Sequence, residues 1–251
     1  MLVTERNPLE RDFFVYTLSL SIIVMNIQII RCVDDAVQAQ WITVVIDVFR
    51  AFTTEAYIFA NGAHTIIPVQ SLDEAYNLKK ENSEYILIWE RGGIKPEGFD
   101  YGNSPTEILN VDFTGKTIIH TTSNGTKGLL LSKNALDILT GSFVNVGAII
   151  KYIKEKNPTS ISLISTSPNT SEENNEDLML AYYIRDMLLG KEISQKEIHE
   201  MMKKTSAYSL LFNEVWVPAS DFELCLDFDR FPFIIQQTEE SGKKVLKKIT
   251  V

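Results

Sequence analysis

The stretch WITVVIDVFRAFTTEAYIFANG, residues 41–62, decides the fold of this chain. Its first eight residues, 41–48, are apolar and rich in β-branched side chains, as expected of a strand buried on both faces of a parallel sheet. Thr53 and Thr54 are candidate caps for a helix over EAYIFANG, and Gly62 suits the position just after its end. The stretch therefore predicts a buried strand followed directly by a helix.

The same alternation of an apolar strand with a helical pattern continues along the chain. Ser71 begins a capping box, VGAIIKYIKEK predicts a helix that stops at Asn157, and Ser194 is a candidate cap of another helix. Further strands are predicted at 64–69, 84–90, 116–122, 135–142 and 160–167. This order predicts an α/β fold, a three-layer α/β/α sandwich with a mostly parallel, mixed sheet.

Composition limits the classes of protein that the chain can represent. Its 251 residues, 45% hydrophobic and 23% charged, suit one large or two small globular domains rather than a disordered or fibrous chain. The net charge of −9 excludes a broad basic footprint for nucleic acid, although a local pocket for one small anion stays open. Cys32 and Cys225 are too few for a disulfide framework and are predicted to be reduced core thiols of a cytoplasmic protein.

Residues 13–24, FFVYTLSLSIIV, form an apolar run whose role the sequence leaves open. A secretory signal needs a positive region before such a run and a small-residue cleavage site after it, and both are missing. Polar residues interrupt the run before it reaches the ~20 residues of a membrane-spanning helix. It is an anchor, an extra helix, or an upstream extension ahead of a true start at Met25, which we favour. We therefore predict an extension over 1–24 and a single domain over 25–251.

Polar side chains follow five predicted strands at their carboxyl ends, where ligands bind in open α/β sheets. The residues concerned are Asp47 and Arg50, Glu90 to Gly93, Thr121 to Thr126, Ser142 and Asn145, and Thr166 to Asp177. One such end is ordinary loop chemistry, whereas five together favour a binding site. The sequence therefore predicts a site along one edge of the sheet.

The residue types at this edge suit an anionic phosphate ester. TTSNGTKG, residues 121–128, supplies hydroxyls and helix-start N–H groups that bind phosphate oxygens, although a capped turn would explain the same residues. Arg50 and Arg91 add planar donors for bidentate anion recognition. Asp47 and Glu90 end apolar strands, where an unpaired carboxylate is costly, so they either pair with the arginines or bind Mg²⁺.

Motifs that would name a mechanism are absent from the sequence. It contains no Gly-x4-Gly-Lys-Ser/Thr loop, no Cys-x5-Arg signature and no Gly-x-Gly-x-x-Gly fingerprint. His120 lies in an apolar strand, and we interpret it as a satisfied core histidine. We interpret DFELCLDFDR, 221–230, as a solvated acidic face rather than a second metal site, and the lysines of 243–248 as a solvated basic face.

Four segments carry more information than the spacing does: VVIDVFRAFTTEAYIFANGA, ERGGIKPEGFDYGNSPTE, GKTIIHTTSNGTKGL and LTGSFVNVGAI. In this order, over roughly residues 25–235, they resemble the 2-phosphosulfolactate phosphatase (ComB) family. The resemblance implies an α/β fold, a homodimer and a Mg²⁺-dependent acid phosphatase that converts 2-phosphosulfolactate to sulfolactate, a step in coenzyme M biosynthesis. The resemblance indicates the type of reaction more firmly than the substrate, so a related phosphorylated hydroxy acid also stays open as the substrate.

The resemblance and the strand-end pattern together give the candidate site residues. We expect catalytic groups at Asp47, Arg50, Glu90, Arg91 and Asn124. Mg²⁺ ligands are expected among Asp47, Glu90, Glu176 and Asp177. Substrate and phosphate are expected to contact Thr53, Thr54, Asn103, Ser104, Thr121, Thr122, Ser123, Gly125, Thr126, Ser142 and Asn145.

The sequence departs from the family pattern after the predicted strand that starts at Ser160. The family usually carries cysteines in the following loop and helix, whereas this chain has Ser165-Thr166-Ser167-Pro168 and no cysteine near Glu176. A mechanism that needs either cysteine as nucleophile therefore cannot run here. Direct attack by metal-activated water and a phospho-aspartyl intermediate on Asp47 both stay open. Two other hypotheses also stay open: a non-catalytic protein that binds a small phosphorylated metabolite, and a membrane-tethered phosphatase.

Overall fold

The computed structural model describes residues 25–89, 95–166, 175–205, 208–209 and 217–251. The predicted extension 1–24, the strand-end residues Glu90 and Arg91, and Ser167 with Pro168 lie outside these ranges. Within them, no helix is long and apolar enough to cross a membrane.

A ten-stranded sheet runs through the described part of the chain in the order β1-β8-β2-β7-β9-β10-β3-β6-β4-β5. The strands are β1 (Asn26–Ile30), β2 (Trp41–Ile46), β3 (Thr65–Val69), β4 (Ile86–Trp89), β5 (Tyr101–Gly102), β6 (Thr117–Thr121), β7 (Ala135–Gly141), β8 (Ser160–Ser165), β9 (Phe233–Glu240) and β10 (Lys243–Thr250). Six of these, β2, β3, β4, β6, β7 and β8, lie where an apolar run predicted a strand. The mostly parallel, mixed sheet is confirmed.

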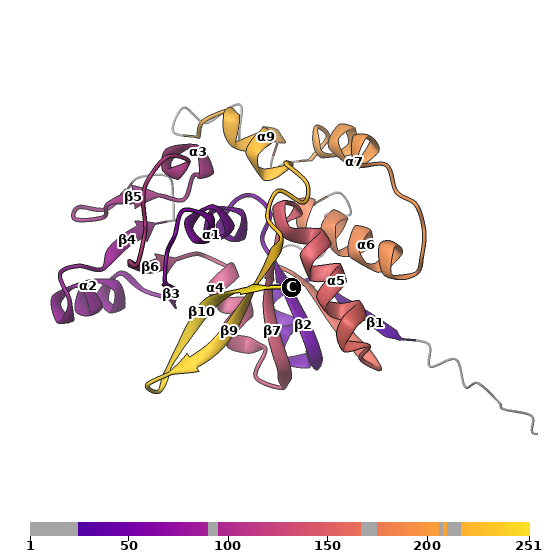
Figure 1. Ribbon diagram of the computed structural model, residues 1–251, viewed down its shortest axis with the longest axis horizontal. Coiled ribbons are helices and arrows are strands. Elements are labelled where there is room, and N and C mark those ends of the chain that lie inside the picture. Colours follow the sequence, from indigo (N-terminus) through magenta and orange to yellow (C-terminus); the bar gives the residue numbers. More distant parts are fainter. Residues whose placement is uncertain (1–24, 90–94, 167–174, 206–207, 210–216) are drawn as a thin grey trace, which may run out of the picture.

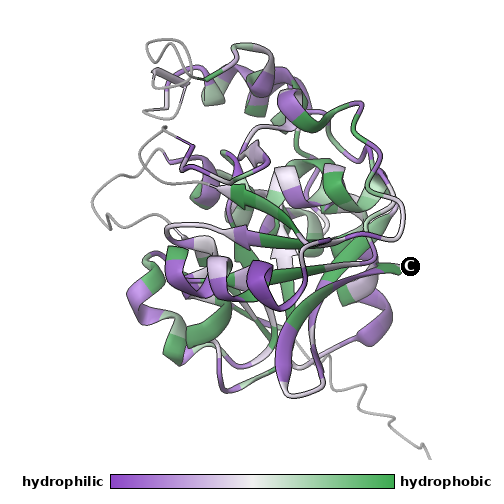
Figure 2. Ribbon diagram, turned by 90° about the vertical axis from the view of Figure 1, so that its left-hand side faces the viewer, coloured by the Kyte–Doolittle hydropathy of each residue, from purple (hydrophilic) through white to green (hydrophobic). Residues whose placement is uncertain are grey.

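Helices cover both faces of the sheet (Figure 1). They are α1 (Ala51–Ala60), α2 (Leu72–Glu81), α3 (Pro105–Ile108), α4 (Gly125–Leu131), α5 (Val146–Lys156), α6 (Glu176–Leu188), α7 (Gln195–Met202) and α9 (Ser220–Cys225), with 3₁₀ turns η1 (Val33–Gln38) and η2 (Phe143–Asn145). One core joins β2, β7 and β8 to α5 and α6, a second lies against α1 and α4, and a third lies under α2. The apolar residues lie mainly on the strands and the inward helix faces (Figure 2). This arrangement confirms the three-layer sandwich.

The sheet consists of two parallel halves that the β9–β10 hairpin joins. Strands β1, β8, β2 and β7 are mutually parallel, and so are β3, β6, β4 and β5. The hairpin is antiparallel to β7 on one side and to β3 on the other, so the two halves run in opposite senses along the sheet. The lysines of 243–248 are exposed or half-buried, as we interpreted them, but they lie on β10, a central strand of the sheet. Val245 and Leu246 are buried there, and the surrounding lysines conceal so short an apolar signal.

The first helix begins differently from the prediction. Its N-cap is Arg50, and the Asp47 carboxylate accepts the Ala51 N–H at 3.1 Å, so Thr53 and Thr54 lie inside the helix. The backbone turns directly from strand to helix, because the Phe52 N–H also bonds the Asp47 carbonyl at 3.1 Å. The predicted caps of α2 and α7 are confirmed. Ser71 accepts from the Glu74 N–H at 3.2 Å, and Ser194 caps α7 in the same way.

A close contact between α4 and β2 gives a test of the packing. A methyl group added at Gly128 would lie 2.6 Å from Val45 Cγ1, on a stiff, buried, β-branched side chain. We expect Gly128→Ala to lower the free energy of unfolding by about 1 kcal/mol or more, since this overlap outweighs alanine's higher helix propensity. Urea denaturation measures the change. Lys127→Ala, which removes only a surface ion pair with Asp34, is the matched control and should cost less than about 1 kcal/mol. A Gly128→Ala protein as stable as the wild type would contradict this packing.

Candidate functional site

Asp47 directly follows β2, and the loop after β6 reaches it from the other half of the sheet. One carboxylate oxygen holds the start of α1 through the Ala51 N–H. The other, Oδ2, faces Gly125 in the loop after β6, where an added Cβ would lie 3.1 Å from it and 3.0 Å from Thr122 Oγ1. A side chain at this position would push these neighbours aside by a few tenths of an ångström, and glycine avoids that displacement. The loop after β6 therefore reaches the residue that follows β2, although the two strands belong to opposite halves of the sheet.

The loop from Thr121 to Thr126 is held by its own hydroxyls. Thr122 Oγ1 accepts the Thr126 N–H at 2.8 Å and lies 3.1 Å from Thr126 Oγ1, and both residues are buried. Ser123 is exposed and Asn124 is half-buried at the start of α4. Thr122 and Thr126 thus shape the loop, while Ser123 and Asn124 lie where a ligand could reach them.

Arg50 is fixed by an acidic residue from the far end of the chain. Its Nη1 lies 2.5 Å from Asp221 Oδ2, and the exposed fractions of the two side chains are 10% and 0%. Asp221 Oδ1 accepts two further hydrogen bonds, from Ser104 Oγ at 2.8 Å and from the Thr106 N–H at 3.0 Å. Asp221 therefore joins α9, the start of α3 and the turn after β2.

The acidic segment 221–230 does not form the solvated face that we expected. It begins as the short helix α9, which places Asp221 inward while Glu223 and Asp229 are exposed. The helical period, not the period of a strand, decides which carboxylates face the site. Asp221 is thus the site residue that the sequence analysis missed, and its position one place before the apolar Phe222 was the available signal.

Several residues that are predicted to contact substrate are buried. They differ in whether their side-chain polar atoms already hydrogen-bond to the protein. Thr53 Oγ1 donates to the Val48 carbonyl at 2.8 Å, so it stabilises the turn into α1. Thr54, Thr121 and Asn103 are buried, and their side-chain polar atoms find no hydrogen-bond partner among the described residues. Buried polar groups normally have a partner, so these three are suited to meet water or a ligand.

Ser142 and Asn145 lie at the end of β7 and bind each other. Asn145 Oδ1 accepts from the Ser142 N–H at 3.3 Å and from the Ser142 hydroxyl at 3.1 Å, and its amide nitrogen donates to the Phe233 carbonyl at 3.4 Å. Both residues are buried. Their hydrogen bonds connect η2 to β9. Their contact with substrate stays a prediction.

Asp177 ties α6 to the ends of β2 and β8. Its Oδ1 accepts the Val48 N–H at 2.9 Å, and its Oδ2 accepts the N–H and the hydroxyl of Thr166 at 3.1 and 3.0 Å. Burial and, to a smaller extent, the negative charge of Glu176 raise the pKa of Asp177 to about 8, although the hydrogen bonds from Val48 and Thr166 lower it. Both carboxylate oxygens of Asp177 already accept hydrogen bonds from the protein. Asp177 is therefore better suited to connect these segments than to bind a metal ion.

Only some of the carboxylates near Asp47 are suited to bind a hard cation such as Mg²⁺. The described residues contain no group of three or more Asp, Glu, His or Cys side chains arranged to hold a metal ion. Mg²⁺ is commonly bound by only one or two carboxylates, with water and substrate phosphate completing its shell. Asp47 ends β2, and half-buried Glu176 starts α6, which Asp177 fixes to the same strand. These two fit such a site better than Asp177, and the predicted ligand Glu90 lies outside the described residues.

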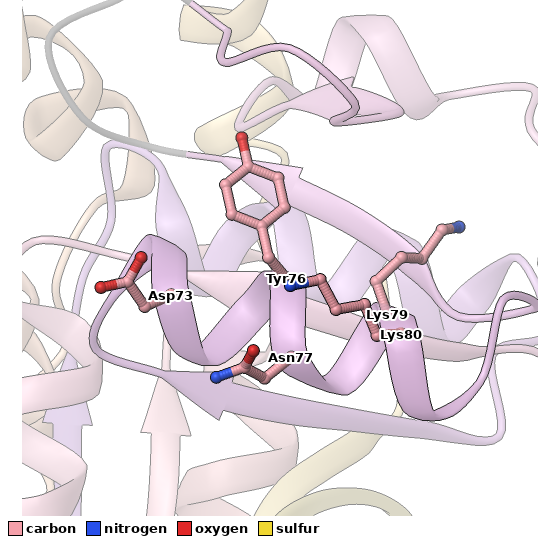
Figure 3. Close-up of a pocket in the computed structure, with 5 residues that line it drawn as sticks. All are labelled: Asp73, Tyr76, Asn77, Lys79 and Lys80. Carbon is pink, nitrogen blue, oxygen red and sulfur yellow. The ribbon is translucent and has the colours of Figure 1, made fainter.

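Two other features lie apart from this chemistry. Cys32 and Cys225 are buried and unbridged, as predicted, and burial raises the pKa of the Cys225 thiol well above its ordinary value. An open pocket is lined by five residues of α2, namely Asp73, Tyr76, Asn77, Lys79 and Lys80 (Figure 3). It contains no predicted site residue.

The ion pair between Arg50 and Asp221 can be tested through stability. Asp221→Asn leaves the buried guanidinium without its counter-charge, so we expect the free energy of unfolding to fall by about 3 kcal/mol. Asp227→Asn, which breaks a surface pair with Arg230, is the control and should cost less than about 1 kcal/mol. Urea denaturation of both variants measures the difference. Equal losses would show that Asp221 does not hold Arg50 in solution.

Comparisons with known proteins show the family of this chain. The sequence model of the 2-phosphosulpholactate phosphatase family matches residues 30–240. The probable 2-phosphosulfolactate phosphatase of Thermoplasma volcanium is 34% identical over 202 residues, which are 80% of this chain and 92% of the relative. The protein of the same name from Thermotoga petrophila is 39% identical over 217 residues, 82% of this chain and 92% of the relative. The chain therefore belongs to the 2-phosphosulfolactate phosphatase family.

Proposed function

We propose that this protein is a phosphoric monoester hydrolase that converts 2-phosphosulfolactate to sulfolactate and phosphate. The curated relatives are named for this activity, and the family model covers most of the chain. The observation that carries the proposal is the close approach of the Thr121–Thr126 loop to Asp47, with Arg50 three residues further along the same turn and paired with Asp221. A carboxylate, a fixed guanidinium and a hydroxyl-rich loop are the groups that phosphate transfer to water requires.

Arg50 and the loop would bind the anionic substrate. Asp221 holds the guanidinium in one orientation, so little side-chain entropy is lost when an anion approaches. Thr122 and Thr126 hold the loop, so Ser123 and Asn124 are presented in a fixed geometry. The buried amide of Asn103 offers both a donor and an acceptor for the carboxylate or sulfonate of the substrate.

We place Mg²⁺ between Asp47 and Glu176, with Glu90 as a further candidate ligand. When bound, the ion would polarise a phosphoryl oxygen and lower the pKa of a water molecule. Asp47 either orients that water or attacks phosphorus itself, which would give a phospho-aspartyl enzyme. Trapping of labelled phosphate on the wild-type protein, and its absence from Asp47→Asn, would select the second route.

The proposal extends to where and in what form the enzyme acts. Two buried, unbridged cysteines are consistent with the reducing environment of the cytoplasm. The family resemblance is the support for a homodimer, and the net charge of −9 argues against nucleic acid as a partner.

Asp47→Asn should separate catalysis from folding. The asparagine oxygen can still accept the Ala51 N–H, so we expect a folded protein with a thermal midpoint close to that of the wild type. Loss of the negative charge should lower kcat by about a hundredfold or more. The matched control is Asp73→Asn, an exposed carboxylate in the first turn of α2. Retention of the wild-type rate by Asp47→Asn would refute the assignment.

Phosphate release tests the function itself. The protein would be assayed at pH 5 to 8, with Mg²⁺ and with EDTA, on 2-phosphosulfolactate, phospholactate, phosphoglycolate and 3-phosphoglycerate. We expect turnover of 2-phosphosulfolactate that requires the metal and exceeds turnover of the other esters. Preference for another ester would keep the chemistry and change the substrate. Binding without release from any ester would instead indicate the non-catalytic binding protein.

A further inference from the structure

One buried ion-forming pair has no part in the chemistry described above. Helix α1 is buried from Ala51 to Phe59, and Glu55 is the one charged residue in that stretch. Its Oε1 lies 3.0 Å from His120 Nδ1 on β6, and the exposed fractions of the two side chains are 1% and 0%. The pair lies between α1 and the sheet, in a core otherwise formed by aliphatic and aromatic side chains.

This pair is poorly suited to stabilising the fold. Glu55 Oε2 and His120 Nε2 find no hydrogen-bond partner in the described part of the chain. Burial raises the pKa of the Glu55 carboxyl, which shows the cost of ionising it there. A half-satisfied buried polar pair is generally less stabilising than well-packed apolar residues of similar volume. The interpretation of His120 as a satisfied core histidine thus holds for Nδ1 alone.

The position of the pair suggests another purpose. Glu55 lies one helical turn after Ala51, whose N–H is bound by Asp47, and His120 directly precedes Thr121. Apolar contacts between α1 and β6 are not directional, so they hold the helix down without fixing its rotation. A hydrogen bond between fixed atoms does fix it. The pair therefore connects the two segments that converge on Asp47.

We infer that Glu55 and His120 are positioning residues whose hydrogen bond sets α1 against β6, so that Asp47 and the Thr121–Thr126 loop keep their close approach. This inference rests on the proposed function, because the approach at Gly125 is taken as part of the active geometry. Neither residue is proposed to contact substrate. Their contribution is the alignment of two catalytic segments, where a displacement of about 1 Å can cost a hundredfold in rate.

The experiment replaces the pair by apolar residues of similar size. We expect the double variant Glu55→Met/His120→Leu to unfold at the same urea concentration as the wild type or a higher one, yet to show at least about a tenfold lower kcat. Glu55→Gln should recover most of the rate, since an amide can still hydrogen-bond the imidazole. The matched control is Glu223→Gln at the exposed pair formed with His199, whose atoms lie 3.1 Å apart, and it should change neither quantity.

The outcomes separate this inference from the proposed function. A double variant with wild-type kcat, or a Glu55→Gln protein no faster than a folded Glu55→Met protein, would overturn the positioning role. If the double variant does not fold, the comparison of Glu55→Gln with Glu55→Met decides alone. If the wild type releases no phosphate, the proposed function fails, and amide hydrogen exchange at residues 47–52 and 121–126 becomes the readout. Unchanged exchange in Glu55→Met would then reject the inference, and faster exchange would support it.

Discussion

The backbone at the end of β2 must find hydrogen-bond partners while it is buried between two layers of helices. Asp177 from α6 accepts the Val48 N–H, and the Asp47 carboxylate accepts the Ala51 N–H. An unpaired donor at these positions would cost free energy comparable to a lost hydrogen bond. The fold thus requires an oxygen acceptor at each of these places, and at Asp47 the acceptor is a carboxylate that lies where we propose that the metal and substrate bind.

A second constraint is the joining of two parallel half-sheets through one antiparallel hairpin. Each half has its own carboxyl edge, and the loop after β6 must approach Asp47 closely for the two edges to form one site. Gly125 makes this approach sterically possible, and Asp221 draws α9 and the start of α3 onto Arg50. The site therefore depends on contacts among segments that are far apart in the sequence.

These constraints also explain how an acidic protein can accept an anionic substrate. The net charge of −9 repels anions at long range, but in salt this field is screened beyond about 8–10 Å. Local donors decide binding at shorter distances, and here Arg50 and the Thr121–Thr126 loop supply them. Asp221 is paired with the Arg50 guanidinium, which reduces its repulsion of the ligand.

The sequence by itself determined the α/β class, most of the strands and the caps at Ser71 and Ser194. Those features follow from local periodicity and capping chemistry, which act over a few residues. Tertiary structure decided that β10 is a central strand, and that Asp221 faces Arg50 across 171 positions. It also paired Glu55 with His120, 65 positions apart. Such contacts depend on how whole elements dock, so no local pattern specifies them.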